Sequence, residues 1–317
     1  MAAPATIPNL AGFAPRRVTP HPNPGAFYPA VCLRRQPTNG VTYAVTSYWE
    51  ERFGDRTRRD VLTQTLTVRA QPAADHWVVT CEATPPVSPT PNPSALEKLL
   101  ERLAALYRRL VLRLTLDGRP VALLNYAEVR ATWDALRQEL LDQAGGNPDE
   151  VTQFLLTGLD AKLEAGASPL LASLRYHYLY GALFANCYEQ AFQSGVRYEQ
   201  PQRFARYFPD TDLWMTERLS VAAPPAPGRV ALRCDGGLAE AHTDRVALAQ
   251  QIDAAQEAAG LPATCPATDP TAIRAAYDAV YDVDVASGWP VAMDVSVRCR
   301  AGLTYHKEYF LSLVQTS

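Results

Sequence analysis

The residues whose types and spacing come closest to a catalytic arrangement lie around the glycine pair Gly236-Gly237. Asp235 precedes the pair, and His242 and Asp244 follow it near a predicted helix start. A histidine beside a carboxylate can act as a general base, and glycines at a helix N-terminus let an anion approach the backbone. No nucleophile accompanies them, because Gly-x-Ser-x-Gly is absent and Cys234 falls within a predicted strand. Aspartate at a helix start is also an ordinary cap, so we assign no catalytic residue.

Carboxylates and histidines elsewhere form no metal-binding pattern. Asp282 and Asp284 lie on one face of a predicted strand, with Asp294 in the strand after the next turn, and three carboxylates could bind Ca²⁺ or Mg²⁺. Their neighbours on the opposite face are apolar, which indicates that the aspartates form the solvent face. His306 and Glu308 share a face of the last strand, but the 5 histidines form neither His-x-His nor His-Glu-x-x-His. The sequence predicts no metal and no cofactor.

Aromatic side chains recur every four residues along a predicted helix over residues 168–192. They are Tyr176, Tyr180, Phe184, Tyr188 and Phe192. Such a stripe could form one wall of a pocket for an apolar or aromatic ligand, with the tyrosine hydroxyl groups as polar contacts. The alternative is a central helix buried on most sides, which the scarcity of charge in this stretch favours. The candidate ligand-binding residues are Tyr176, Tyr180, Phe184 and Tyr188.

Composition and charge limit the class of protein. The chain has 317 residues, of which 47% are hydrophobic and 20% charged, and its net charge is −3. These values are typical of a globular protein with a substantial core. The 30 basic and 33 acidic residues provide no electrostatic footprint for nucleic acid and no polybasic membrane patch. We expect neither nucleic acid nor membrane as a partner.

The N-terminus and the cysteines predict a cytoplasmic protein. Residues 1–10 lack a basic start, and prolines interrupt any apolar core, so no signal peptide is expected. Residues 170–192 contain too many polar groups for a lipid-exposed helix. The 6 cysteines are scattered without a Cys-x-x-Cys pair. Free thiols in a reducing compartment are the expectation, and three disulfides are the alternative.

Local patterns divide the chain into four segments. Residues 1–40 hold eight prolines and predict an extended arm. Residues 41–126 alternate apolar and polar side chains and form an N-terminal β-rich unit around one helix. Residues 127–207 show helical periodicity and form a helical insert. Residues 208–317 form a C-terminal β-rich unit that ends in a three-stranded meander.

A short phrase links the two β-rich units. Gly118-Arg119-Pro120-Val121-Ala122 returns, 170 residues later, as Gly288-Trp289-Pro290-Val291-Ala292. Both follow a predicted strand, and both regions run strand, strand, helix, strand, turn, strand. We therefore predict an α+β fold of antiparallel β-meanders, built from two ββαββ-like units with a central all-helical insert. An internal duplication is one explanation, and chance recurrence in similar turns is the other.

Three functions fit these patterns. The first is a non-enzymatic binding or assembly protein that engages a protein partner, or a second copy of itself, through the proline-rich arm and the sheet surface. The second binds a small apolar or aromatic molecule between a curved sheet and the aromatic helix. The third is a hydrolase whose site the sequence does not reveal. It would require at least three of Asp235, His242, Asp244, His306 and Glu308 to converge.

Overall fold

A computed structural model provides the coordinates. It describes residues 17–20, 31–88, 95–175, 177–184, 188–189, 191–193, 196–205, 207–208, 210–222, 226–260, 268–302 and 304–316.

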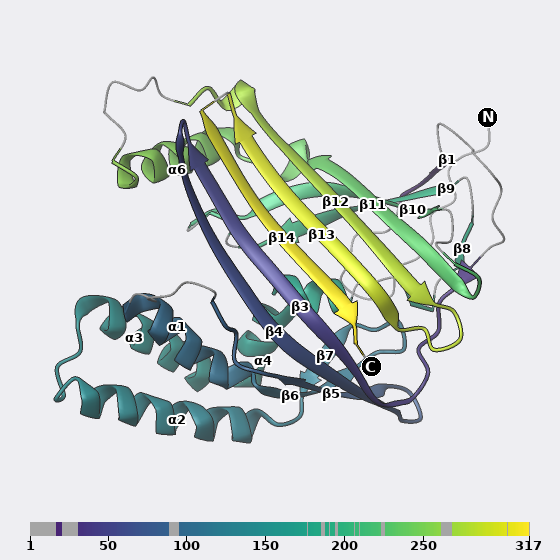
Figure 1. Ribbon diagram of the computed structural model, residues 1–317, viewed down its shortest axis with the longest axis horizontal. Helices are drawn as coiled ribbons and strands as arrows, with labels where there is room; N and C mark the ends of the chain where they lie inside the picture. The colour runs from purple at the N-terminus through teal and green to yellow at the C-terminus, as the bar shows by residue number, and fades with distance from the viewer. Residues whose placement is uncertain are drawn as a thin grey trace. The chain divides into compact units, whose positions relative to one another are not determined.

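Most of the described strands belong to one antiparallel sheet of 12 strands (Figure 1). The strand order is β1-β9-β10-β11-β12-β13-β14-β3-β4-β5-β6-β7, and β2 pairs with β8 in a sheet of 2 strands. The strands are β1 (Arg17–Pro20), β2 (Val31–Cys32), β3 (Thr38–Phe53), β4 (Arg56–Pro72), β5 (Trp77–Ala83), β6 (Arg109–Leu114), β7 (Pro120–Leu123), β8 (Ala191–Phe192), β9 (Val196–Phe204), β10 (Leu213–Ala222), β11 (Arg229–Leu238), β12 (Ile273–Asp284), β13 (Pro290–Ala301) and β14 (Tyr305–Gln315).

The described segments also contain 6 α-helices and 3 short 3₁₀ helices. The α-helices are α1 (Ala95–Leu103), α2 (Tyr126–Gln143), α3 (Glu150–Glu164), α4 (Ala167–Arg175), α5 (Tyr178–Leu183) and α6 (Arg245–Ala258). The 3₁₀ helices are η1 (Ala104–Tyr107), η2 (Glu240–His242) and η3 (Pro270–Ala272). The prediction of an α+β protein with antiparallel sheet is confirmed.

The predicted long aromatic helix is wrong. The chain forms α4 and then α5, and His177 before α5 has the extended backbone angles φ −72° and ψ 125°. Helix also does not continue to residue 207, because Val196–Phe204 is a strand, β9, with Tyr198 and Phe204 buried on one face. The four-residue spacing therefore does not create a stripe on a single helix.

The chain divides into two compact units, and neither is a continuous segment. Unit 1 comprises Met1–Arg34, Thr46–Val61 and Gln190–Val314. Unit 2 comprises Arg35–Val45, Leu62–Glu189 and Gln315–Ser317. Both β3 and β4 contribute residues to each unit.

The core of unit 2 lies on one face of its strands and beneath its helices. Alternate residues of β4, β5 and β6 are buried, as period-2 side-chain alternation requires. The fully buried ones include Leu66, Val68, Val79, Cys81, Leu110, Leu112 and Leu114. Helices α1, α2 and α3 lie side by side (Figure 1). Arg102 of α1 donates to Gln143 of α2, and Trp133 of α2 donates to Asp160 of α3.

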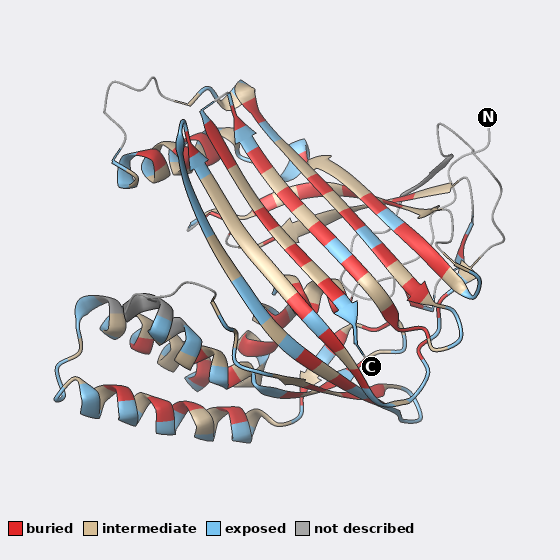
Figure 2. Cartoon of the chain, viewed as in Figure 1, coloured by how far each residue is buried: buried red, intermediate tan, exposed pale blue. Residues whose placement is uncertain are grey.

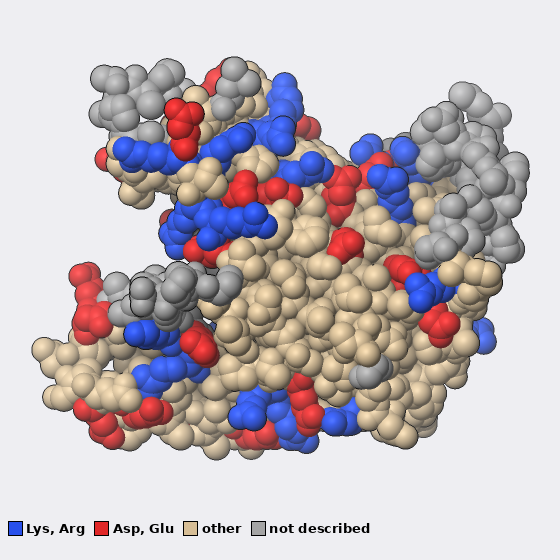
Figure 3. All heavy atoms as spheres, in the orientation of Figure 1, with Lys and Arg blue, Asp and Glu red and all other residues tan. Residues whose placement is uncertain are grey.

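The core of unit 1 follows the same rule over longer strands. Figure 2 shows buried residues alternating with more exposed ones along β12, β13 and β14. The buried face of β13 contains Met293, Val295, Val297 and Cys299. The other face of these strands carries ion pairs such as Arg229–Asp282 and Arg298–Asp278. On the side drawn in Figure 3, acidic and basic side chains are interspersed.

The repeated phrase marks two turns with the same backbone requirement. Gly118 has φ +94° and Gly288 has φ +69°, in the left-handed region that favours glycine. The order β4-β5-α1-β6-β7 matches β10-β11-α6-β12-β13. A turn requirement alone can account for the shared glycines, and the internal duplication stays a prediction.

Parts of the predicted arm pair with strands of unit 1. Strand β1 pairs with β9 in antiparallel register, Arg17 opposite Glu199, and Val31 of β2 lies opposite Phe192 of β8. The remaining residues before position 31 lie outside the described residues.

Candidate functional site

Two of the predicted aromatic residues, Phe184 and Tyr188, contact Arg35 in the core of unit 2. Tyr180, Phe184 and Tyr188 are all buried, and Tyr176 lies outside the described residues. The rings of Tyr180 and Phe184 are stacked with centroids 6.4 Å apart. The Arg35 guanidinium carbon lies 3.7 Å from the Tyr188 ring centroid and 5.6 Å from that of Phe184. Two of the four predicted ligand contacts, Phe184 and Tyr188, thus pack against a side chain of their own protein, and Tyr180 stacks on Phe184.

The groups around Arg35 lie in a low-dielectric interior. Arg35 itself is 4% exposed and donates to the Leu183 carbonyl oxygen at 3.5 Å. Burial raises the pKa of Cys81 to about 12, and it also raises the pKa of Tyr43 far above its ordinary value. Arg35 opposes both shifts because its positive charge favours the thiolate and the phenolate. These features are those of a packed core with cation–π contacts.

Asp235, His242 and Asp244 do not form a catalytic group. Asp235 Oδ1 accepts from Arg218 Nε at 2.9 Å. The His242 ring lies over Trp214, with ring centroids 5.2 Å apart. Asp244 caps α6 by accepting two backbone N–H groups, each at 3.0 Å. Each residue is therefore engaged in a separate local interaction.

His306 and Glu308 contact each other, and Glu308 also contacts Ser296. This arrangement does not suit nucleophilic catalysis. Ser296 Oγ donates to Glu308 Oε1 at 2.9 Å, and His306 Nε2 lies 3.6 Å from Glu308 Oε2. Because the carboxylate stands between serine and histidine, His306 is not placed to accept the serine proton. Arg300 donates to His306 Nδ1 at 3.1 Å, and burial together with Arg300 lowers the pKa of His306. The arrangement stabilises the outer face of β13 and β14.

The three predicted carboxylates do not meet either. Asp282 pairs with Arg229 at 2.8 Å, and Asp284 accepts the backbone N–H of Ser287 at 2.7 Å. Asp294 lies opposite Val280 in the β12–β13 register. Within the described ranges, no group of three His, Cys, Asp or Glu side chains could hold a metal ion. Cys32, Cys81 and Cys299 carry free thiols, and Cys187 and Cys265 lie outside the described residues.

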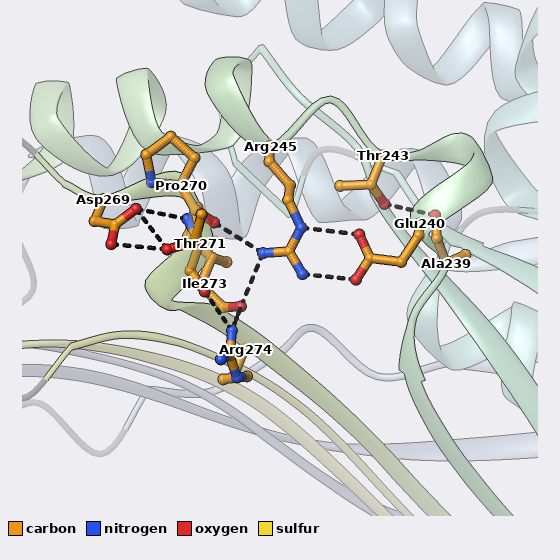
Figure 4. Close-up of polar contacts among 9 residues, drawn as sticks. All are labelled: Ala239, Glu240, Thr243, Arg245, Asp269, Pro270, Thr271, Ile273 and Arg274. Carbon is orange, nitrogen blue, oxygen red and sulfur yellow. Dashed lines mark hydrogen bonds and ion pairs between the residues drawn. The ribbon is translucent and has the colours of Figure 1, made fainter.

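A polar cluster in unit 1 connects the start of α6 with η2 and with the segment around η3 (Figure 4). Arg245, at the start of α6, makes a two-point ion pair with Glu240 of η2, at 2.6 and 2.8 Å. Its Nη1 donates to the carbonyl oxygens of Pro270 and Ile273 at 2.8 and 3.1 Å. Arg245 also holds the pKa of Glu240 below its usual range. The cluster borders a cavity of about 460 Å³, where the Arg245 guanidinium is engaged by its own chain.

We expect Arg245→Gln to lower the urea midpoint of unfolding of the full-length protein. The change removes the ion pair and the charge-assisted bonds to two carbonyl groups. Arg274→Gln is the matched control, because Arg274 donates only to the carbonyls of Thr271 and Ile273 and forms no ion pair with a described residue. An equal loss in both variants would show that the Glu240 pair contributes nothing.

The Lys307 ammonium group is surrounded by aromatic rings and pairs with a carboxylate of the same chain. Its Nζ is 3.4 Å from Glu51 Oε1, and the Tyr305 hydroxyl donates to the same oxygen at 2.8 Å. Ring centroids lie 5.2–5.8 Å from Nζ, and they belong to Trp49, Tyr207 and Phe208. The adjoining cavity is about 200 Å³. That volume is below the range of about 300–1,000 Å³ typical of small-molecule sites.

Another cavity lies in unit 2 and is about 600 Å³. Its walls are formed by β4, the end of β5, η1 with the two arginines that follow it, and the first turns of α2. We call it the threonine groove, because four threonine residues line it. They are Thr65, Thr67, Thr84 and Thr132. The volume falls in the small-molecule range, and the lining mixes these threonines with the apolar residues Ala83, Leu106 and Val129.

An ion-pair chain runs along the threonine groove. Arg109 Nη1 lies 2.5 Å from Glu128 Oε2, and Arg109 Nε lies 3.8 Å from Glu82 Oε1. Glu82 also pairs with Arg69. Asn125 donates to Glu128 at 3.2 Å and to the Arg109 carbonyl at 3.0 Å. This chain joins the sheet to the start of α2 and holds two walls of the groove together.

Arg108 differs from its neighbour Arg109. Its backbone N–H donates to the Ala105 carbonyl, and its side chain is exposed at the groove. It forms no ion pair with any residue the structure describes. Sequence reasoning missed this residue. The Arg108-Arg109 pair at the end of a predicted helix, and the threonines at 63, 65 and 67 on one strand face, were the available signals.

No protein-family model matches the chain, and no curated protein matches it. In the part of the chain that the structure describes, none of the helices is both long and apolar enough to cross a bilayer.

Proposed function

We propose that the protein is a non-enzymatic binding protein whose threonine groove takes a small polar molecule. The observation that carries the proposal is a cavity of about 600 Å³ with polar groups on every wall. The ion pairs of Arg109 with Glu82 and Glu128 hold the groove in shape without a ligand, as expected of a largely preformed site. Asp235, His242 and Asp244 are engaged in separate local contacts, and the Glu308 carboxylate stands between Ser296 and His306, which favours binding over chemistry.

Binding of a protein partner through residues 1–40 and the sheet is the alternative proposal, and the strand pairing gives it less support. Strand β1 already pairs with β9, and β2 with β8. At the other end of the described sheet, β7 has only 4 residues and begins with Pro120. Short strands and proline at a sheet end oppose the addition of another strand.

Native mass spectrometry of the full-length protein tests the groove. The protein is incubated with the low-molecular-mass filtrate of a cell extract, and we expect an adduct of small-molecule mass. Ala105→Trp, which places an indole at an exposed residue of the groove, should remove the adduct. Ala161→Trp is the control, because Ala161 is exposed on α3 and does not line the groove.

An adduct that survives Ala105→Trp would place the ligand elsewhere and refute the proposed site. Absence of any adduct on the unaltered protein would refute the binding function itself. Circular dichroism of both tryptophan variants shows that each is folded. Loss of the adduct in Ala105→Trp alone, with both variants folded, is the supporting result.

A further inference from the structure

The charges lining the threonine groove are paired except at one position. Glu82 and Glu128 are both bound by Arg109, and Arg69 contributes a second positive partner to Glu82. The chain Arg69–Glu82–Arg109–Glu128 is therefore electrically neutral by itself. Arg108 adds one positive charge to the lining of the groove, and no described carboxylate pairs with it.

The Thr84 hydroxyl group of the groove has a hydrogen to donate to a ligand. Thr84 Oγ1 accepts the Thr65 backbone N–H at 2.9 Å, which leaves its own hydrogen available. Thr132 Oγ1, in contrast, donates to the Glu128 carbonyl at 2.9 Å. Arg109 pairs with both carboxylates of the groove, Glu82 and Glu128, so these acceptors already have a partner. The groove thus offers a ligand the Thr84 hydroxyl as a donor and the Arg108 guanidinium as a donor with a positive charge, and anionic oxygens are the partners that match both.

We infer that the ligand of the threonine groove is a small organic anion whose carboxylate or phosphate group pairs with Arg108. This inference rests on the proposed function. A guanidinium group presents a fixed fork of N–H donors that fits the paired oxygens of either group. Arg108 is the specificity-determining residue, and Arg109 is a positioning residue that holds Glu82 and Glu128 away from the ligand.

The charge of the ligand can be measured without knowing its identity. The low-molecular-mass filtrate is separated on an anion-exchange resin into a bound and an unbound fraction, and each is added to the full-length protein before native mass spectrometry. We expect the adduct from the bound fraction only. Pretreatment of that fraction with alkaline phosphatase distinguishes the two sources, since a phosphate ester is lost and a carboxylate persists.

Two arginine variants complete the test. Arg108→Gln should require at least about tenfold more of the bound fraction for half-saturation, as expected for loss of one charge-assisted pair. Arg113→Gln should leave half-saturation unchanged, because Arg113 is exposed on β6 and does not line the groove. Equal affinity of Arg108→Gln and the unaltered protein would overturn the inference.

The failures of the two proposals are distinguishable. An adduct from the unbound fraction alone, removed by Ala105→Trp, would overturn the anionic ligand and leave the groove as the binding site. No adduct from either fraction, or an adduct that Ala105→Trp does not remove, would overturn the proposed function.

Discussion

Replacing Trp133 by alanine will lower the free energy of unfolding of the protein by about 3–5 kcal/mol. Trp133 is fully buried in α2, and its Nε1 donates to Asp160 Oδ1 of α3 at 2.8 Å. Removing the indole leaves a cavity between packed helices and takes a donor from a carboxylate. Arg137 Nε still binds the other oxygen of Asp160 at 2.9 Å, so the carboxylate keeps one partner. Urea unfolding followed by far-UV circular dichroism measures the loss.

Trp133→Phe separates packing from the hydrogen bond. Phenylalanine fills much of the space but has no N–H, so we expect a smaller loss, about 1–3 kcal/mol. If Trp133→Ala cost less than about 1 kcal/mol, the indole would not be an anchor of the core. Because α2 also carries Glu128 and Thr132 of the threonine groove, Trp133→Ala should weaken the adduct as well.

The fold could be predicted wherever a local period determines it. The meander β12–β14 follows from alternation and from the turns at Gly288 and Gly302, both with positive φ. The break in the predicted helix over 168–192 could not be predicted from the sequence. It falls at His177, which has no neighbouring proline or glycine. The pairing of strands that lie far apart in the sequence could not be predicted either. Strand β14 lies next to β3, and nothing in either pattern specifies that partner.

The threonine groove was harder to predict than the fold. Thr65 and Thr67 alternate visibly, yet the opposite wall is formed by α2, about sixty residues later. Arg108 and Arg109 are chemically identical, and only the positions of Glu82 and Glu128 decide which one is paired. The aromatic spacing drew attention to Tyr180, Phe184 and Tyr188. Arg35, the partner of Phe184 and Tyr188, lies in the proline-rich segment, where no period indicated a role.

Of the glycine pair Gly236-Gly237, which suggested an anion site, only Gly236 is closely packed against its neighbours. Gly236 lies opposite Glu217 of β10 and Tyr277 of β12. A Cβ atom on Gly236 would lie 2.8 Å from the Thr216 carbonyl oxygen and 3.2 Å from Tyr277 Cβ. Gly237 has room, since the nearest atom to its Cβ position is the Ala275 carbonyl oxygen at 3.9 Å.

Gly236→Ala should therefore destabilise the protein by about 1–3 kcal/mol, because backbone and a buried ring must move to admit one methyl group. Gly237→Ala, the adjacent residue of the same strand, should be neutral or stabilising by up to about 1 kcal/mol, since alanine restricts the unfolded chain. Urea midpoints of the two variants give the comparison, and the same m-value in both would show that only stability changed. Equal midpoints would mean that β11 shifts to admit the methyl group. A midpoint lowered only by Gly236→Ala would show that close packing against the Thr216 carbonyl oxygen and Tyr277 requires glycine at this position.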